Sequence, residues 1–260
     1  MKYLLLITVF VSTLFGSSAH AALIFSDDFT SADSSDLNLT PGSRQSGSAG
    51  TQSWVETGNP DASISSNVLS INDGETSSAN DSNIYLNYDL KAAGALLTGG
   101  GSFTISFDMA PNTKYGGFFL GNPSTRYVNV PTTDFMMLMD GNSTASVWDG
   151  GIQQHDTTAV GGTGVKSYLF TVTTDNFNFN TDFFISLELN GSPYDLNASV
   201  AGTIYNGKWD SGSSLYVGFS SRTGTTTIDN FAINSIPEPS SMLLLLTAGG
   251  TLLLLRRKRS

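Results

Sequence analysis

The sequence predicts an all-β domain, a two-sheet antiparallel β-sandwich, over residues 22–235. Short runs that alternate apolar and polar residues recur along this segment, and turn-forming residues separate them, a pattern typical of sandwiches. The segment is rich in Gly, Ser, Thr, Asn and Asp between these runs. No stretch shows a convincing helical repeat of apolar residues.

The chain starts with a predicted signal peptide over residues 1–21. Lys2 supplies a positive start, and residues 4–15 form an apolar core of suitable length. Ala19 and Ala21 place small side chains at both recognised positions of a cleavage site, so we expect cleavage after Ala21. The alternative is an uncleaved membrane anchor, but the apolar run is short for a span of roughly 20 residues.

Twelve runs in the domain predict strands. Residues 102–109 alternate most clearly, with Phe103, Ile105, Phe107 and Met109 on one face, which predicts that this face is buried. The other predicted strands are 23–25, 68–71, 84–88, 117–120, 135–139, 145–148, 168–172, 183–189, 198–205, 215–219 and 226–233.

The sequence also predicts the place of two strands in their sheet and the position of a turn and two loops. The runs at 117–120 and 135–139 are continuously apolar, which predicts strands in the middle of a sheet. Asn190-Gly191 predicts a tight hairpin turn. Residues 30–65 are poor in apolar side chains and predict a long surface loop, and residues 92–97 are better explained as a loop than as a helical turn.

Composition limits the function. Five of the 12 basic residues and one of the 22 acidic residues lie in the two chain ends, which leaves 21 acidic and 7 basic residues and a net charge near −14 between them. Such a surface repels phosphate, so nucleic acid is not an expected partner. It suits calcium or simple solubility equally well. The absence of cysteine excludes thiol catalysis and cysteine-based zinc sites.

The C-terminal residues combine three features in order. Pro237-Glu238-Pro239 precedes an apolar segment at 242–255, and four basic residues follow at 256–259. The apolar segment could extend about 21 Å as a helix, against a hydrocarbon core of about 30 Å, which makes it a marginal membrane anchor. The basic residues should remain cytoplasmic.

This arrangement over 236–260 resembles the PEP-CTERM sorting signal, in which Pro237, Glu238 and Pro239 form the sorting motif. The resemblance implies an exosortase-type membrane protease as partner and a transient membrane anchor formed by a single hydrophobic helix. It also implies an exported protein that passes through the inner membrane to the cell surface or the extracellular space. An ordinary tail anchor is the alternative.

The order of features in the domain resembles the concanavalin A-like (laminin G-like) jelly roll. The matching pieces are Asp27-Asp28-Phe29 near the start and Ile228-Asp229-Asn230-Phe231 near the end. The resemblance implies that the last strand lies beside the first. It also implies a structural calcium ion, Ca2+, held by Asp27, Asp28 and Asp229, although these residues could instead cap turns or face solvent.

Aromatic residues beside Gly, Asn and Asp are candidates for sugar stacking. Trp148 and Trp209, in Trp148-Asp149-Gly150 and Lys208-Trp209-Asp210, are the first candidates for glycan binding. Core packing is the alternative interpretation, and the commoner one for tryptophan.

The sequence offers little for catalysis. A glycanase of this shape would carry closely spaced acids, but Glu56, Glu75 and Glu188 are isolated. His155 is the only histidine beyond the signal peptide and is expected in a polar loop.

We therefore expect no enzyme, but an exported, exosortase-processed protein with a structural or adhesive role near exopolysaccharide. The alternative is a carbohydrate-binding module. A diverged glycan hydrolase or lyase is less favoured.

Overall fold

The structure is a computed structural model. It describes residues 21–57, 61–73, 82–92, 101–111, 115–121, 133–139, 144–149, 152–197, 203–209 and 214–236. One compact unit spans Leu23–Ser235. The predicted sorting motif, the apolar segment at 242–255 and residues 1–20 of the predicted signal peptide lie outside the described residues.

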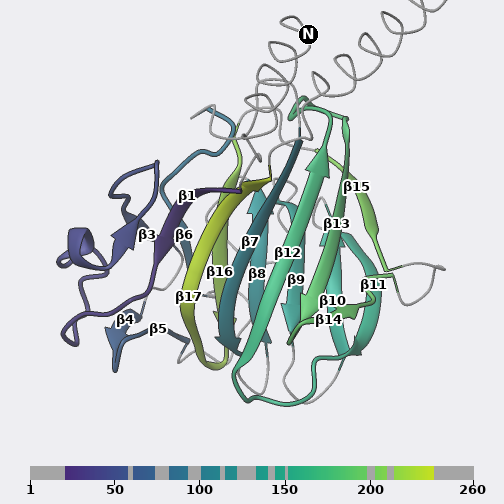
Figure 1. Ribbon diagram of the computed structural model, residues 1–260. Coiled ribbons are helices and arrows are strands. Elements are labelled where there is room, and N and C mark those ends of the chain that lie inside the picture. Colours follow the sequence, from purple (N-terminus) through teal and green to yellow (C-terminus); the bar gives the residue numbers. More distant parts are fainter. Residues whose placement is uncertain are drawn as a thin grey trace, which may run out of the picture. The chain divides into compact units, whose positions relative to one another are not determined.

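The described residues form an all-β sandwich of two antiparallel sheets, which confirms the predicted architecture (Figure 1). The main path of the ten-stranded sheet runs in the order β14 (Ser192–Tyr194), β13 (Asp182–Leu189), β12 (Lys166–Thr174), β7 (Gly101–Ala110), β17 (Gly224–Ile236), β1 (Ala22–Asp27) and β2 (Gln45–Ser46). Three strands join this path at its sides: β15 (Tyr205–Lys208) on β13, β5 (Val68–Asp73) on β17, and β4 (Ala62–Ser65) on β5.

The seven-stranded sheet forms the second layer. Its order is β11 (Ile152–Ala159), β10 (Thr144–Asp149), β9 (Thr133–Met139), β8 (Tyr115–Gly121), β16 (Tyr216–Arg222), β6 (Ser82–Leu86) and β3 (Trp54–Thr57). The continuous apolar runs in β8 and β9 do lie in the middle of this sheet, as predicted. In the described part of the chain, a three-residue 3-10 turn, Pro41–Ser43, is the one helical element.

Alternation decides which face of each strand is buried. In β7 every second residue is buried, from Phe103 through Ile105 and Phe107 to Met109, as the sequence predicts. β12 pairs with β7 in full register and repeats the pattern with Tyr168 and other inward residues. The two strands together therefore present one apolar face to the sandwich interior and one polar face outward.

The interior is dominated by aromatic rings from both sheets. Phe107 of the ten-stranded sheet lies 4.9 Å from Phe219 and 5.2 Å from Phe118, both of the seven-stranded sheet, measured between ring centroids. Phe118 also stacks on Phe170 at 4.4 Å. These pairs join the two layers and bury all four rings almost completely.

The last strand lies next to the first, as the predicted resemblance implies. β17 lies between β7 and β1 in the ten-stranded sheet, as the yellow-green and purple strands of Figure 1 show. The hairpin at Asn190-Gly191 is also confirmed, because β13 and β14 pair on either side of it. Both turn residues have positive φ, 52° and 74°, as a type I′ turn requires.

A buried polar network closes the sandwich at β1. The carboxylate of Asp27 forms an ion pair with Arg44 Nε at 3.2 Å and accepts hydrogen bonds from the side chains of Gln45 and Trp54 and from the backbone N–H of Phe29. Trp54 belongs to the seven-stranded sheet, so its bond to Asp27 connects the two sheets. Burial lowers the pKa of Arg44, and the nearby carboxylate of Asp27 opposes this shift.

Three predictions about local structure were wrong. Residues 30–65 are not one surface loop, because β2, β3 and β4 form there and bury Trp54 and Ile64. Of the predicted strand at 198–205, residues 203 and 204 are not in a strand and β15 begins only at Tyr205, while residues 198–202 lie outside the described residues. His155 is not in a loop but on β11, whose polar sequence lacks the apolar alternation of a half-buried strand.

Candidate functional site

The outer face of the seven-stranded sheet carries a row of side chains that crosses every strand. Pairing places these residues directly opposite one another, and we call them the cross-sheet row. In order from β3 to β11 the row consists of Val55, Tyr85, Gly218, Phe119, Met136, Trp148 and Gln153. At roughly 4.8 Å between strands, the row extends about 29 Å.

Apolar residues form a packed floor under the centre of this face. Phe119, Met136 and Leu138 are 3–6% exposed and make a second apolar cluster, separate from the sandwich interior. Tyr85, Tyr115 and Trp148 pack against this cluster and are themselves half-buried. The floor therefore holds partly exposed aromatic rings in place on the outer face.

Two further contacts order the aromatic rings. Tyr85 meets Tyr216 edge-to-face at 5.4 Å between ring centroids, and the guanidinium of Arg222 lies 5.4 Å from the ring centre of Tyr115. Tyr85, Tyr115, Trp148 and Tyr216 thus present four half-buried rings on one sheet face. Rings that are fixed before binding lose little conformational freedom when a ligand stacks on them.

Glycine makes this packing feasible. A Cβ atom at Gly218 would collide with the Phe119 ring and would lie 2.5 Å from the backbone oxygen of Ile84. A Cβ atom at Gly117 would collide with Ser220 Oγ and lie 2.9 Å from Met136 Cε. The two glycines let neighbouring side chains lie flat over the sheet.

Polar side chains lie beside the cross-sheet row. The next row on the same face contains Asn83, Ser220, Ser146 and Asp156. Ser146 Oγ donates to Asp156 Oδ1 at 2.8 Å, and Gln153 Nε2 donates to the same oxygen at 2.5 Å. Gly117 and Leu138 separate the two pairs, and Asn83 and Ser220 are buried, so the accessible hydrogen-bonding groups of this row are Ser146 and Asp156, beside Trp148 and Gln153.

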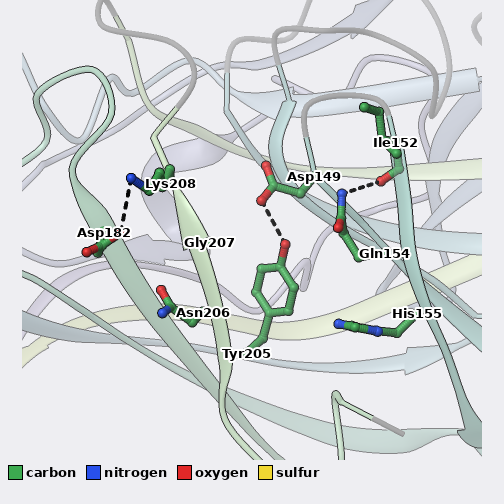
Figure 2. Close-up of a pocket in the computed structure, with 9 residues that line it drawn as sticks. All are labelled: Asp149, Ile152, Gln154, His155, Asp182, Tyr205, Asn206, Gly207 and Lys208. Atoms are coloured by element: carbon green, nitrogen blue, oxygen red, sulfur yellow. Dashed lines mark hydrogen bonds and ion pairs between the residues drawn. The ribbon is translucent and has the colours of Figure 1, made fainter. Parts of the chain in front are cut away.

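A separate groove lies at the rim, where the edges of the two sheets meet. Its volume is about 440 Å³, and we call it the rim groove (Figure 2). The lining residues come from β10 and β11 on one side and from β13 and β15 on the other: Asp149, Ile152, Gln154, His155, Asp182, Tyr205, Asn206, Gly207 and Lys208.

A hydrogen bond between the sheets supports the centre of the rim groove. Tyr205 OH donates to Asp149 Oδ2 at 2.7 Å, as the dashed line in Figure 2 shows. The Tyr205 ring is 3% exposed and packs on Phe135 and Phe183. Nearby, Tyr194 OH and Thr157 Oγ1 lie 2.7 Å apart and connect β14 to β11.

The β11 wall owes its shape to a bulge. Val147 pairs with His155 and Trp148 pairs with Gln153, so Gln154 has no opposing residue on β10. A bulge changes the direction of a side chain, and here Gln154 lines the rim groove. The His155 ring meets the Tyr205 ring edge-to-face at 6.2 Å between centroids.

Charge in the rim groove is slightly negative. The described lining contains the carboxylates of Asp149 and Asp182 and one ammonium, that of Lys208. Lys208 Nζ lies 3.9 Å from Asp182 Oδ1, and both side chains are more than half exposed. Such an exposed pair is weak, so both groups can turn toward a ligand.

The two predicted glycan-binding tryptophans lie in different environments. Trp148 is in the cross-sheet row, half-buried, on the outer face. Trp209 is not at a loop edge, because it is 1% exposed, packs on Phe183 at 4.3 Å and donates its indole N–H to Thr174 Oγ1. Trp209 is therefore a core residue.

The predicted calcium ligands are not arranged as a metal site. The carboxylate of Asp27 is bound by the side chains of Arg44, Gln45 and Trp54 in the buried polar network at β1. Asp28 Oδ1 accepts the backbone N–H of Thr30, and Asp229 Oδ1 accepts that of Asn230. Within the described ranges, no group of three or more acidic or histidine side chains could hold a metal ion.

The isolated glutamates remain apart. Glu56 is on β3, where burial and then the negative charge of Asp61 raise its pKa. Glu188 points outward from β13 opposite Pro193, and Glu75 lies outside the described residues.

The functional residues that the sequence analysis missed lie in the polar segment 152–156, which supplies most of one wall of the rim groove.

Comparisons with known proteins give information on the fold. No protein-family model matches the sequence, and no curated protein matches it. A sialidase structure is similar with a TM-score of 0.50 and 10% identity, over 85% of this chain and 19% of that one. This chain thus spans about a fifth of the sialidase, and the similarity shows a shared fold alone.

Other solved structures are less similar. A variant of the alginate lyase Aly36B, in complex with an alginate tetrasaccharide, has a TM-score of 0.45 and 10% identity, over 84% of this chain and 98% of that one. The carbohydrate-binding module CBM66 from Bacillus subtilis has a TM-score of 0.44 and 11% identity, over 70% and 95%.

A search of the described residues for membrane-spanning helices finds none that is long and apolar enough.

Proposed function

We propose that the protein binds carbohydrate on the outer face of its seven-stranded sheet. The observation that carries the proposal is the set of four half-buried rings, Tyr85, Tyr115, Trp148 and Tyr216, held over the packed floor of that face. Ligand sites commonly combine aromatic side chains with a few polar groups that orient the ligand, and this combination suits a polar ligand that also has apolar faces.

The dimensions of the cross-sheet row suit an extended glycan. The row is about 29 Å long, and its accessible residues Val55, Tyr85, Trp148 and Gln153 lie toward its two ends, so an extended glycan could contact it with more than one sugar unit. Ser146 and Asp156, one row away and not buried, could bond to sugar hydroxyl groups. Carbohydrate binding therefore takes first place, ahead of the purely structural or adhesive role that the sequence favoured.

Export completes the proposal. We infer from the two chain ends that the protein is exported as a concanavalin-like sandwich, processed by an exosortase-type protease at Pro237-Glu238-Pro239, and retained near extracellular polysaccharide. The acidic composition suits the solubility of a secreted domain. We propose binding without catalysis.

A glycan array and affinity electrophoresis with full-length protein test the binding proposal. We expect Trp148→Ala to weaken binding to the best polysaccharide about 10-fold, because truncating an aromatic residue that anchors a ligand typically costs more than ~1 kcal/mol. Phe179→Ala is the matched control, since Phe179 is an exposed aromatic residue outside both the cross-sheet row and the lining of the rim groove. Absence of binding to any polysaccharide would refute the proposal.

The proposed absence of catalysis is tested separately. We expect no sustained release of reducing ends or unsaturated products from a polysaccharide panel. Sustained release that survives further purification would show an enzyme.

A further inference from the structure

The rim groove is distinct from the outer face, although one hairpin builds part of both. Trp148 and Gln153 point to the outer face, whereas Asp149 and Ile152, the next residues on the same two strands, line the rim groove. A ligand on the cross-sheet row would therefore not occupy the rim groove.

We propose that the rim groove is a second glycan site, one that takes a single neutral sugar unit and discriminates against uronic acids. The inference rests on the proposed carbohydrate-binding function, and adds a second position and a class of ligand.

The size and the polar lining support a sugar unit. A volume of about 440 Å³ is at the small end of the range for ligand sites. Asn206, Gln154 and Lys208 are exposed and offer amide and ammonium groups, and the carboxylate of Asp182 offers acceptors for hydroxyl pairs. Ile152, 66% exposed, adds an apolar patch suited to the C–H face of a sugar.

The charged side chains that line the rim groove favour a neutral ligand. Two carboxylates and one ammonium line the rim groove in the described part of the chain, and Lys208 is already beside Asp182. A uronic acid would add a third carboxylate, which the groove and the acidic protein around it would repel. A neutral sugar meets no such penalty.

The rim groove is also pre-formed. Tyr205 and Asp149 hold its centre by the 2.7 Å bond between sheets, and Gly207 is packed closely there, because a Cβ atom would lie 2.5 Å from Phe183 Cζ and 3.0 Å from Asp149 Oδ2. Little rearrangement is then needed on binding.

Ligand-observed NMR on full-length protein, with methyl glycosides of glucose, galactose, mannose and glucuronic acid as probes, tests the proposal. We expect at least one neutral glycoside to bind at millimolar concentration. Asn206→Ala and Gln154→Ala, both exposed and outside the core, should each weaken that binding at least fivefold. Glu188→Gln, at an exposed residue of β13 outside the lining of the rim groove, should leave it unchanged.

A charge variant tests the discrimination. Asp182→Asn should strengthen binding of methyl glucuronide roughly threefold, as expected from removing one exposed charge. Glu188→Gln, on the same outward side of β13, is the control and should have no effect.

Each outcome is decisive. Polysaccharide binding without binding of any neutral glycoside would overturn the rim-groove site and leave the proposed function intact. Glucuronide binding as tight as that of the neutral sugars, or neutral-glycoside binding that both Asn206→Ala and Gln154→Ala leave unchanged, would also overturn it. Binding of a neutral glycoside that Asn206→Ala removes, without any polysaccharide binding, would support the rim groove and refute the outer face.

Discussion

Tyr205 on β15 donates its hydroxyl hydrogen to Asp149 on β10 at 2.7 Å, so one hydrogen bond joins the edges of the two sheets beneath the rim groove. At the β1 side of the sandwich, Trp54 and Asp27 make a comparable connection at 2.9 Å. In both, an aromatic side chain packs in the interior while its polar end bonds a carboxylate of the opposite sheet. Both connections can be tested by substitution.

Tyr205→Phe removes the bond at the rim without changing the size of the ring. We expect a loss of about 1–2 kcal/mol in the free energy of unfolding, because a hydrogen bond to a charged group is lost. Urea denaturation measures the loss as a lower midpoint at unchanged slope. Tyr216→Phe, on the outer face, is the control, and equal loss in both variants would contradict the assignment.

Asp27→Asn removes the negative partner of buried Arg44. We expect a loss of about 3–5 kcal/mol, because the guanidinium is left buried without its countercharge. Asp175→Asn, at an exposed carboxylate, should change stability by less than about 0.5 kcal/mol. Chemical denaturation of the three proteins side by side measures both values, and a stable Asp27→Asn variant would show that the ion pair is dispensable.

Gly218→Ala introduces a methyl group where the Phe119 ring and the Ile84 backbone leave no space. We expect a loss of about 1–3 kcal/mol from overpacking, together with weaker polysaccharide binding as the floor of the outer face shifts. Gly164→Ala is the matched control, since nothing lies within 4 Å of the added atom. Thermal melts and affinity electrophoresis check both effects, and wild-type values for Gly218→Ala would refute the packing argument.

Asp229 contributes to the pH dependence of stability. Burial raises the pKa of its carboxyl group, and nearby Asp108 and Asp28 raise it further against the bond from Asn230. Because the folded pKa is raised, the group favours the folded state below its unfolded pKa, and this contribution is lost as pH rises through the folded pKa. We therefore expect Asp229→Asn to raise the melting temperature at pH 7, with the difference shrinking toward pH 3.

The same melts address the predicted calcium site. If Asp229 bound calcium with Asp27 and Asp28, the variant would melt lower at pH 7, and a chelator would lower the melting temperature of the wild type. We expect no effect of chelator, since Asp27 is engaged by Arg44.

Processing of the two chain ends predicts a specific mass. Intact-mass analysis of exported protein should give an N-terminus at Ala22 and a C-terminus near residues 236–240. A protein that keeps its C-terminal Ser260 would indicate a permanent anchor, and one that keeps Met1 as well and stays inside the cell would refute export.

Strands in which apolar and polar residues alternate clearly can be predicted from the sequence. Strands with a polar sequence, which form because a neighbouring strand pairs with them, cannot. β7 is recognisable from Phe103, Ile105 and Phe107 alone, because one face must be buried. β11 is not, since it lies at a sheet edge and its sequence around His155 is polar. Nothing local distinguishes such a strand from a loop.

The candidate sites depend on contacts between distant residues. Trp148 and Trp209 have similar neighbours in sequence, yet one lies in the cross-sheet row and the other in the core. Their environments follow from strand register and from how the sheets close, which composition does not encode. The bond from Tyr205 to Asp149 likewise spans 56 positions and has no local signal.

The interior place of β17 has a consequence for how the chain reaches its native state. This strand comes last along the described chain, yet β7 and β1 both depend on it for hydrogen bonds. The ten-stranded sheet therefore cannot close until residues 224–236 have emerged from synthesis or translocation. A chain that stalls before Gly224 would leave β7, β1 and β5 each without one partner strand, and unpaired strand edges are the surfaces through which β proteins aggregate.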